Sequence, residues 1–266
     1  MHPSINIHKA DPNMPTATAK PAATVLLVRS INGSIEVFMM LRNKKTNFGG
    51  AWVFPGGKLE GSDRKVDIQN YSHGVTDPTA SKILGIKTGG LDFWIACIRE
   101  CFEESGILLA YKPSGKLLGI PNGLEEKVLN RYRQYLNNGE PVLFEMCKEL
   151  NLKLAVNQLV YLSHWITPKT ELKRYSTRFF VGLAPPGQQG VHDGSESVKS
   201  LWISPNDALM GGESGELPML LPTKKNLEAI EGFKTTQELF KQKESEQYEV
   251  KPVQPKIKDG KIINLT

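Results

Sequence analysis

Short runs of aliphatic residues near the start of the chain predict β-strands. One run spans residues 23–29 and a second spans residues 35–41, with Asn32-Gly33 between them. Asn-Gly between two such runs predicts a hairpin, because both residues tolerate the positive φ of a tight turn. Residues 52–54 predict a short third strand that ends at Pro55-Gly56-Gly57, where the backbone must turn.

A longer helix is predicted for residues 93–105. Ile95, Ile98 and Phe102 recur at helical spacing, so one face of this helix is expected to pack on a core. Asp92 is predicted to cap its start and Gly106 to end it. The preceding residues, 58–90, show no sustained periodicity and are expected to be irregular.

The rest of the chain alternates between helical and strand patterns. It predicts strands at residues 159–166, 177–183 and 198–203, a helix that starts at Ser204-Pro205, and further helices at residues 122–136, 141–150, 226–231 and 236–242. We therefore predict one mixed α/β (α+β) domain over residues 22–242, with insertions at residues 64–90 and 122–150. Residues 1–21 are expected to form a flexible lead-in, and residues 243–266 a mobile tail.

The composition is that of an ordinary globular protein, with 39% hydrophobic residues and a net charge of +5 over 266 residues. The basic residues are spread along the chain, and no apolar run is long enough to span a membrane. Neither nucleic acid nor a membrane is therefore an expected partner. The modest positive charge suits an anionic small molecule.

The cysteines and the chain ends bear on the expected compartment. Cys97, Cys101 and Cys147 are odd in number and lack Cys-x-x-Cys spacing, which argues against a disulfide framework or a zinc site. The first residues lack the apolar region of a secretory signal, and the last four, Ile-Asn-Leu-Thr, are unlike a peroxisomal Ser-Lys-Leu address. We expect a cytoplasmic protein.

Three carboxylates on the predicted helix are the candidate chemistry. Glu100, Glu103 and Glu104 stand at i, i+3 and i+4, so they project from one face of the helix. Their repulsion destabilises the helix unless something offsets it, and Mg²⁺ or Mn²⁺ prefers such oxygen ligands. A solvated acidic face is the alternative that the spacing alone leaves open.

The residues around these carboxylates resemble the Nudix signature. Arg99 to Ile107 match its second half, with Cys101 in a hydrophobic position. Gly57 matches the Gly of its first half, and Asp63 stands where the family usually has Glu. Residues 64–98 then separate the two halves, where the family has a much shorter spacer. This split box is similar to the acyl-CoA diphosphatase group of Nudix hydrolases, known as the motif-19 type, which carries a long insertion at this place.

Four other segments resemble the same group, so the resemblance spans about residues 23–227. They are residues 50–57, 164–168, 177–180 and 201–205. Thr46 and Ser176 depart from the pattern, because CoA-directed relatives carry Arg and Asp at these places. The resemblance implies a Nudix fold, in which a mixed β-sheet is sandwiched between helices.

The resemblance also implies a metal site. Glu100, Glu103 and Glu104 would hold Mg²⁺ or Mn²⁺, and the carbonyl of Gly56 would complete the ligand set. Arg99 would orient the carboxylates through bidentate hydrogen bonds. Such metal ions neutralise a diphosphate and activate a water for attack on it.

The resemblance leaves more than one candidate for the general base and for the substrate contacts. Glu196, in the loop before residues 198–203, is the candidate base outside the box, and Glu100 or Glu103 is the alternative within it. Arg42, Arg174, Arg178 and Gly57 are the candidate substrate contacts, since basic side chains bind phosphate.

The predicted activity is hydrolysis of CoA or acyl-CoA to 4′-phosphopantetheine, or its acyl form, and 3′,5′-ADP. One alternative is a Nudix hydrolase of another nucleoside diphosphate derivative, such as ADP-ribose or NADH. A nucleotide-binding module without catalysis is the other alternative, although it has no need of three aligned carboxylates. The protein could act as a homodimer.

Overall fold

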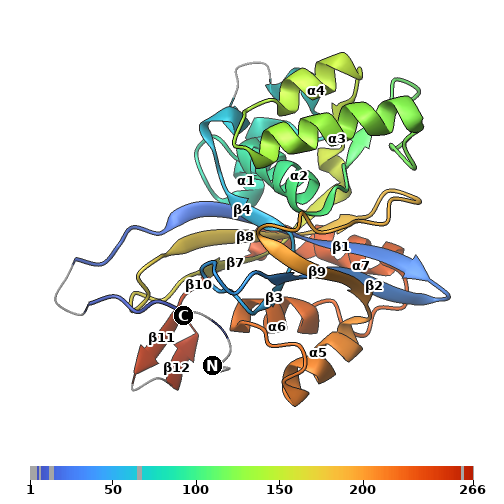
Figure 1. Cartoon of the computed structure of the whole chain (residues 1–266). Coiled ribbons are helices and arrows are strands. Elements are labelled where there is room, and N and C mark those ends of the chain that lie inside the picture. Colours follow the sequence, from blue (N-terminus) through green and yellow to red (C-terminus); the bar gives the residue numbers. More distant parts are fainter. Residues whose placement is uncertain (1–4, 6, 12–14, 65–67, 259–260, 266) are drawn as a thin grey trace.

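A mixed β-sheet forms the centre of the protein in the computed structural model, which describes residues 5, 7–11, 15–64, 68–258 and 261–265 (Figure 1). The strand order is β10-β7-β8-β1-β2-β3, with β4 paired to β1 and β9 paired to β2. The pairs β1–β8 and β7–β10 are parallel, and the other pairs of this sheet are antiparallel. The strands are β1 (Lys20–Ile31), β2 (Ser34–Arg42), β3 (Trp52–Val53), β4 (Gly56–Lys58), β7 (Leu159–Ile166), β8 (Tyr175–Leu183), β9 (Ser197–Ile203) and β10 (Pro252–Val253).

Helices cover both faces of this sheet, as the predicted sandwich requires (Figure 1). One face carries α1 (Asp77–Leu84), α2 (Leu91–Ser105), α3 (Gly123–Asn137) and α4 (Leu143–Glu149), and the other carries α5 (Pro205–Ser214), α6 (Leu221–Glu228) and α7 (Thr236–Glu246). Smaller elements are the 3-10 helices η1 (Gly61–Arg64), η2 (Ile68–Tyr71), η3 (Val156–Gln158) and η4 (Gln247–Glu249) and the strand pairs β5 (Ala110–Tyr111) with β6 (Lys153–Leu154) and β11 (Pro255–Lys258) with β12 (Lys261–Leu265).

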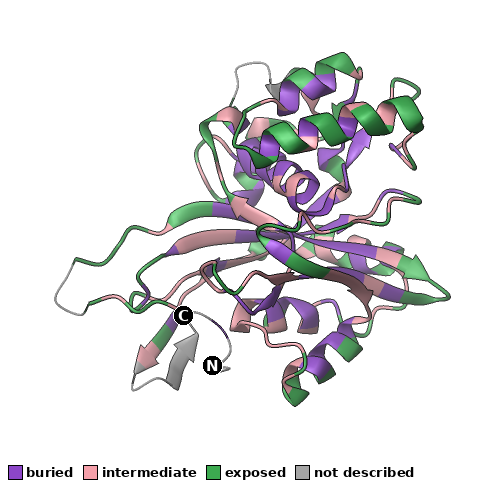
Figure 2. Cartoon of the chain, viewed as in Figure 1, coloured by how far each residue is buried: buried purple, intermediate pink, exposed green. Residues whose placement is uncertain are grey.

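Each face of the sheet has its own hydrophobic core, and Figure 2 shows buried residues in the sheet and in the helices on both of its sides. Successive residues of β8 show the division: Phe180 belongs to the core beneath α2, and Phe179 belongs to the core on the α5–α7 face. This follows from the alternation of side chains along a strand. Within the part of the chain that the structure describes, no helix combines the length and apolar character needed to cross a bilayer.

The first hairpin forms as predicted. Asn32 and Gly33 connect β1 to β2 with φ values of 51° and 78°. Both values are positive, which is the backbone conformation that Asn-Gly tolerates in a two-residue turn.

The region expected to be irregular, residues 58–90, contains the helix α1, so that prediction is wrong. Pro78 lies in the first turn, and Gly85 ends the helix in the left-handed conformation with φ 64°. These are ordinary start and stop signals. The helix has only eight residues, which is too short for a periodic pattern to show.

The start of α2 also differs from the prediction. Gly90, not Asp92, is the residue before its first turn, and Asp92 lies inside the helix. The capping carboxylate comes from Asp77 of α1, whose Oδ1 accepts from Leu91 N at 3.0 Å and whose Oδ2 accepts from Gly89 N at 3.2 Å. The helix therefore gains its cap from a neighbouring helix.

Both ends of the chain contact the rest of the protein, although the sequence predicts a flexible lead-in and a mobile tail. Lys9 forms an antiparallel bridge with Glu171. At the other end α7 continues to Glu246, and β10 adds a parallel strand beside β7. The predicted mobile tail therefore contains regular structure. Residues 1–4, 6, 12–14, 65–67, 259–260 and 266, which belong to the predicted lead-in, insertion and tail, lie outside the described residues.

The Asp77 cap generates the first prediction. Replacing Asp77 with Ala leaves two backbone N–H groups at the start of α2 without their acceptor, so we expect a loss of about 1 kcal/mol and a fall in Tm of about 3 °C. Thermal unfolding monitored by circular dichroism measures this. Glu244→Ala, at an exposed position of α7, is the control, and an equal Tm in both variants would contradict the capping role.

Candidate active site

The three carboxylates of α2 lie against the β1–β4 edge of the sheet. Glu100 and Glu103 line a cavity of about 490 Å³, within the size range of small-molecule sites. Glu104 is turned toward β4, where its Oε2 accepts a hydrogen bond from Gly56 N at 2.8 Å. The i, i+3, i+4 spacing therefore presents all three to one region, as predicted, but with different neighbours.

Arg99 is buried behind these carboxylates and pairs with Asp63. Its Nε and Nη2 donate to the two oxygens of Asp63 at 2.8 and 3.1 Å, and both side chains are almost fully buried. The same guanidinium donates from Nη1 to Glu100 at 3.0 Å and to Glu103 at 3.1 Å. Burial alone would lower the pKa of Arg99, but the hydrogen bonds and charges of Asp63 and the glutamates raise it, so the side chain stays charged.

The two glycines of the Pro-Gly-Gly turn allow β4 to approach α2. A Cβ atom on Gly57 would lie 2.4 Å from Oε1 of Glu100, and one on Gly56 would lie 2.4 Å from Oγ1 of Thr24. Neither distance is sterically possible. Gly57 lines the cavity, as the predicted substrate contact requires, and its missing side chain makes the space that the carboxylate of Glu100 occupies.

The electrostatics of the carboxylates fit a divalent cation. Burial raises the pKa of Glu100 to about 7 and that of Glu103 to about 8, although Arg99 opposes both shifts. Burial, together with the charge of Glu100, raises the pKa of Glu104 well above its usual range. Arg99 and Arg42 together do not compensate these three carboxylates and Asp63, and a hard cation with oxygen ligands would.

The carboxylates do not form a ready-made cage. Among the described residues, no group of three or more His, Cys, Asp or Glu side chains is close enough to hold a metal ion as it stands. Oxygens of Glu100 and Glu103 bind Arg99, and an oxygen of Glu104 binds the backbone of Gly56. The donor chemistry thus fits Mg²⁺ or Mn²⁺, and reorientation of these side chains would be needed to bind it.

Arg42 and Glu196 meet at the same cavity from β2 and from the loop before β9. Arg42 Nη2 lies 3.3 Å from Oε2 of Glu196, and its Nη1 lies 3.8 Å from Oε1 of Glu104. Glu196 keeps 60% of its side chain exposed. The structure therefore brings the predicted outside base and one predicted phosphate contact to the carboxylates.

The other two predicted phosphate contacts lie elsewhere. Arg174 is buried and donates to the backbone oxygens of Thr167 and Ala17. Arg178 is buried on the α2 face of the sheet, 4.1 Å from the ring centroid of Phe93. Neither is among the described residues that line the cavity, because Tyr175, Thr177 and Phe179 of β8 face it and strand alternation turns Arg178 away. The structure therefore brings neither of these two arginines to the cavity.

Arg133 of α3 supports the site without having been predicted. Its guanidinium donates to the backbone oxygens of Glu103, Glu104 and Val191 at 2.8 to 3.0 Å. It thus satisfies carbonyls at the end of α2, where a helix has no partners of its own. No local signal in the sequence joins Arg133 to α2, since the contact depends on how α3 packs.

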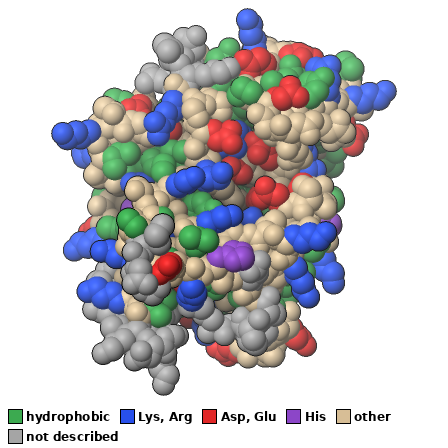
Figure 3. Space-filling view, turned by 60° about the vertical axis from the view of Figure 1, so that its left-hand side comes forward, with side chains coloured by type: hydrophobic (Ala, Val, Ile, Leu, Met, Phe, Trp, Pro, Cys, Tyr) green, Lys and Arg blue, Asp and Glu red, His purple; other side chains and the backbone are tan. Residues whose placement is uncertain are grey.

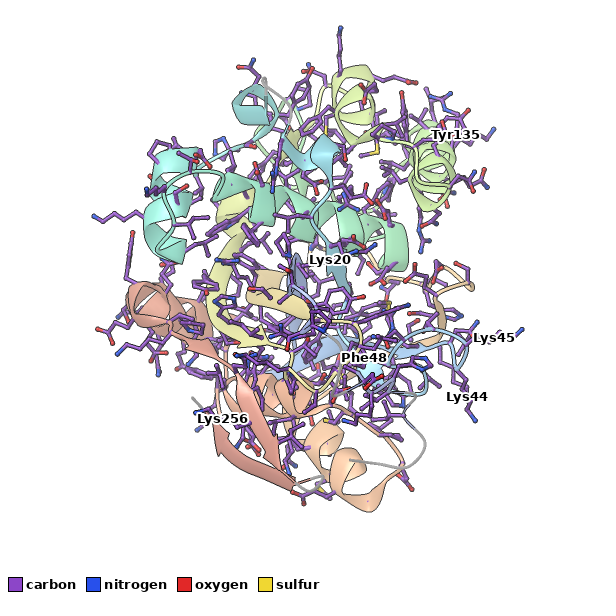
Figure 4. All side chains as sticks on the ribbon, turned by 90° about the vertical axis from the view of Figure 1, so that its left-hand side faces the viewer. Lys20, Lys44, Lys45, Phe48, Tyr135 and Lys256 are labelled. Atoms are coloured by element: carbon purple, nitrogen blue, oxygen red, sulfur yellow. The ribbon has the colours of Figure 1, made fainter. Side chains whose placement is uncertain are left out.

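The opening of the cavity is flanked by charged side chains. In the space-filling view, Asp and Glu side chains gather near the middle of one face, with Lys and Arg side chains beside them (Figure 3). Figure 4 shows Lys20 and Phe48 near the centre of a similar view, with Lys44 and Lys45 projecting from the β2–β3 loop at the side. These lysines are exposed, whereas Phe48 is half-buried and lines the cavity.

A family model described as the NUDT19 Nudix domain matches residues 75–228. The chain belongs to this family. The resemblance to the motif-19 type of Nudix hydrolase, inferred from the split box, is thereby confirmed.

Curated relatives and a solved structure agree with this family. The chain is 28% identical over 238 residues to acyl-coenzyme A diphosphatase NUDT19 of Xenopus laevis, covering 77% of this chain and 62% of the relative. It is 25% identical over 221 residues to the Homo sapiens protein of that name, covering 72% of this chain and 59% of the relative. The chain thus spans about three fifths of the length of these relatives.

The solved structure is a Nudix hydrolase from Alicyclobacillus acidocaldarius. It aligns with a TM-score of 0.68 and 23% sequence identity over 85% of this chain and 97% of that chain. This likeness confirms the predicted Nudix fold.

The Arg99–Asp63 pair generates a stability prediction. Asp63→Ala leaves a buried guanidinium without its main partner, so we expect a loss of about 3 kcal/mol in the free energy of unfolding, measured by urea denaturation. Asp63→Glu restores a carboxylate and should recover part of the loss. Glu149→Ala breaks an exposed pair with Arg131 and should change stability little, so similar losses in Asp63→Ala and Glu149→Ala would refute this view.

His164 generates a pH prediction. Burial, helped by the charge of Arg178, lowers the pKa of His164 to about 4, and its Nε2 lies 2.7 Å from Ser176 Oγ. Between about pH 6.5 and 4 the unfolded chain therefore takes up a proton that the native state does not, and stability falls as the pH falls through this window. We expect Tm to fall less in His164→Asn over this range. His8→Asn, at an exposed site, should retain the wild-type pH dependence.

Proposed function

We propose that the protein is a divalent-metal-dependent diphosphatase that cleaves CoA or acyl-CoA to 4′-phosphopantetheine, or its acyl form, and 3′,5′-ADP. The observation that carries this proposal is the meeting of Glu100 and Glu103 with Arg42 and Gly57 in one cavity. The relatives named acyl-coenzyme A diphosphatase support the choice of substrate.

Glu100, Glu103 and Glu104 would hold the Mg²⁺ or Mn²⁺, with the carbonyl of Gly56 as a further ligand by resemblance. When bound, the metal supplies charge neutralisation for the diphosphate and a lowered pKa for water. Arg99 is a positioning residue in this proposal, because its Nη1 contacts both Glu100 and Glu103 and its other nitrogens are held by Asp63 and by Lys58 O.

The reaction adds water across the diphosphate bridge. The water oxygen bonds to one phosphorus, the bond from that phosphorus to the bridging oxygen breaks, and the water proton passes to a carboxylate. Glu196 is the favoured acceptor, since it lines the cavity and its side chain is exposed enough to exchange the proton with solvent. Glu100 and Glu103 remain the alternatives within the box.

Arg42 and two lysines of the loop after β2 are the phosphate contacts of this proposal. Arg42 would bind the diphosphate, because it lines the cavity beside Glu196 and its Nε has no hydrogen-bond partner among the described residues. Lys44 and Lys45 are exposed on the next loop and would meet the 3′-phosphate of CoA. A cytoplasmic location and a homodimer stay predictions.

The metal set is tested by Glu103→Gln and Glu104→Gln. Each change removes a charged ligand while keeping the size of the side chain, so kcat with Mg²⁺ or Mn²⁺ should fall by at least about 100-fold. The assay is release of 3′,5′-ADP from CoA, with thermal unfolding to show that the fold is kept. Glu244→Gln on α7 is the matched control, and wild-type turnover in both box variants would exclude the mechanism.

The substrate is tested by comparing kcat/KM for CoA, an acyl-CoA, ADP-ribose and NADH. We expect CoA or its thioester to be preferred. Turnover of ADP-ribose with inert CoA thioesters would show that the protein acts on another nucleoside diphosphate derivative. Nucleotide binding without turnover of any of the four would favour a non-catalytic module.

A further inference from the structure

The cavity has a charged end and an apolar end. The charged end holds Glu100, Glu103, Arg42 and Glu196, next to β4. From there the cavity follows β8, whose residues Phe179, Thr177 and Tyr175 all line it. At the rise of a β-strand, the path from Phe179 to Tyr175 is about 13 Å long.

Apolar side chains from distant parts of the chain surround the far end. Trp165 and Tyr175 come from the sheet, and Leu221 comes from the start of α6. Ile7 and Ile257 complete the lining from the two ends of the chain. Glu171, the partner of Lys9, also lines the cavity near this segment. Apart from this paired carboxylate, the side chains named for the far end are aliphatic and aromatic, which matches a ligand with a charged part and an apolar part.

The segment that carries Ile7 is held in place by specific contacts. Leu172 N donates to His8 O and Ala10 N donates to Thr170 O, both at 2.9 Å. The side chain of Lys9 pairs with Oε1 of Glu171. These contacts fix residues 8–10 along the loop before β8, and so place Ile7 at the cavity.

The Lys9–Glu171 pair has a buried partner. Glu171 is only 4% exposed, and its Oε2 has no hydrogen-bond partner among the described residues. Removing Lys9 would leave this carboxylate buried without a compensating charge, which strongly favours rearrangement of the loop or of the N-terminal segment. Lys9 therefore acts on the cavity through Glu171.

We propose that the apolar end of the cavity binds the acyl chain of a CoA thioester, with Ile7 as a specificity-determining residue of its wall and Lys9 as the positioning residue that holds this wall. This inference rests on the proposed function, since the charged end then takes the diphosphate. It assigns to the N-terminal segment a role in choosing between acylated and free CoA.

The test measures kcat/KM for octanoyl-CoA and for free CoA in the full-length protein. Ile7→Asp places a charge in the apolar wall, so the ratio of octanoyl-CoA to CoA should fall by at least about 10-fold. Lys9→Ala should lower the same ratio, and Lys9→Arg, which keeps the ion pair, should restore it. Ile120→Asp is the matched control, because Ile120 is 74% exposed outside the cavity, and it should keep the wild-type ratio.

An unchanged ratio in Ile7→Asp with an unchanged Tm overturns the inference and leaves the proposed function intact. An equal fall for both substrates also overturns it, since the wall would then contact the pantetheine part. If Ile7→Asp lowers Tm, the kcat/KM ratios of Lys9→Ala and Lys9→Arg test the inference instead, and an unchanged ratio in Lys9→Ala overturns it. If the wild-type protein hydrolyses neither substrate, the proposed function fails. The inference is then tested by the affinities for octanoyl-CoA and for CoA in EDTA, measured by titration calorimetry, and the ratio of these two affinities in each variant takes the place of the kcat/KM ratio.

Discussion

The buried guanidinium of Arg99 is the group on which the rest of the site depends. It binds Asp63 through Nε and Nη2 and the backbone oxygen of Lys58 also through Nη2, and its Nη1 donates to Glu100 and Glu103. Three segments, η1, the end of β4 and α2, are thus joined by one planar cation. Water solvates these carboxylates less than it would on an exposed helix face, so the charge of this arginine offsets part of their mutual repulsion.

The insertion between the two halves of the box supports α2 through α1, whose Asp77 caps the start of α2. Asp63, just before the insertion, stands in η1 and accepts from Arg99. The carboxylate-bearing helix is therefore held at its start by α1, at its middle by Asp63 and at its end by Arg133 of α3.

The sheet separates two environments along β8. On the α2 face, Arg178 and Phe180 are buried among aromatic side chains, and burial together with the charge of Arg178 keeps the pKa of His164 low. On the other face, Thr177 and Phe179 line the cavity. The two-residue period of a strand makes this separation strict, so neighbouring positions of the same motif have unrelated roles.

The sequence alone predicted several structural features of this protein and its family. The Asn32-Gly33 hairpin and the helix at Glu100 to Glu104 depend on dihedral preferences and periodicities of neighbouring residues, and the split box indicated the family. Packing decided the rest. Arg174 binds backbone carbonyls and Lys9 pairs with Glu171 because segments far apart in the sequence pack together. No pattern of neighbouring residues predicts which distant segments come into contact.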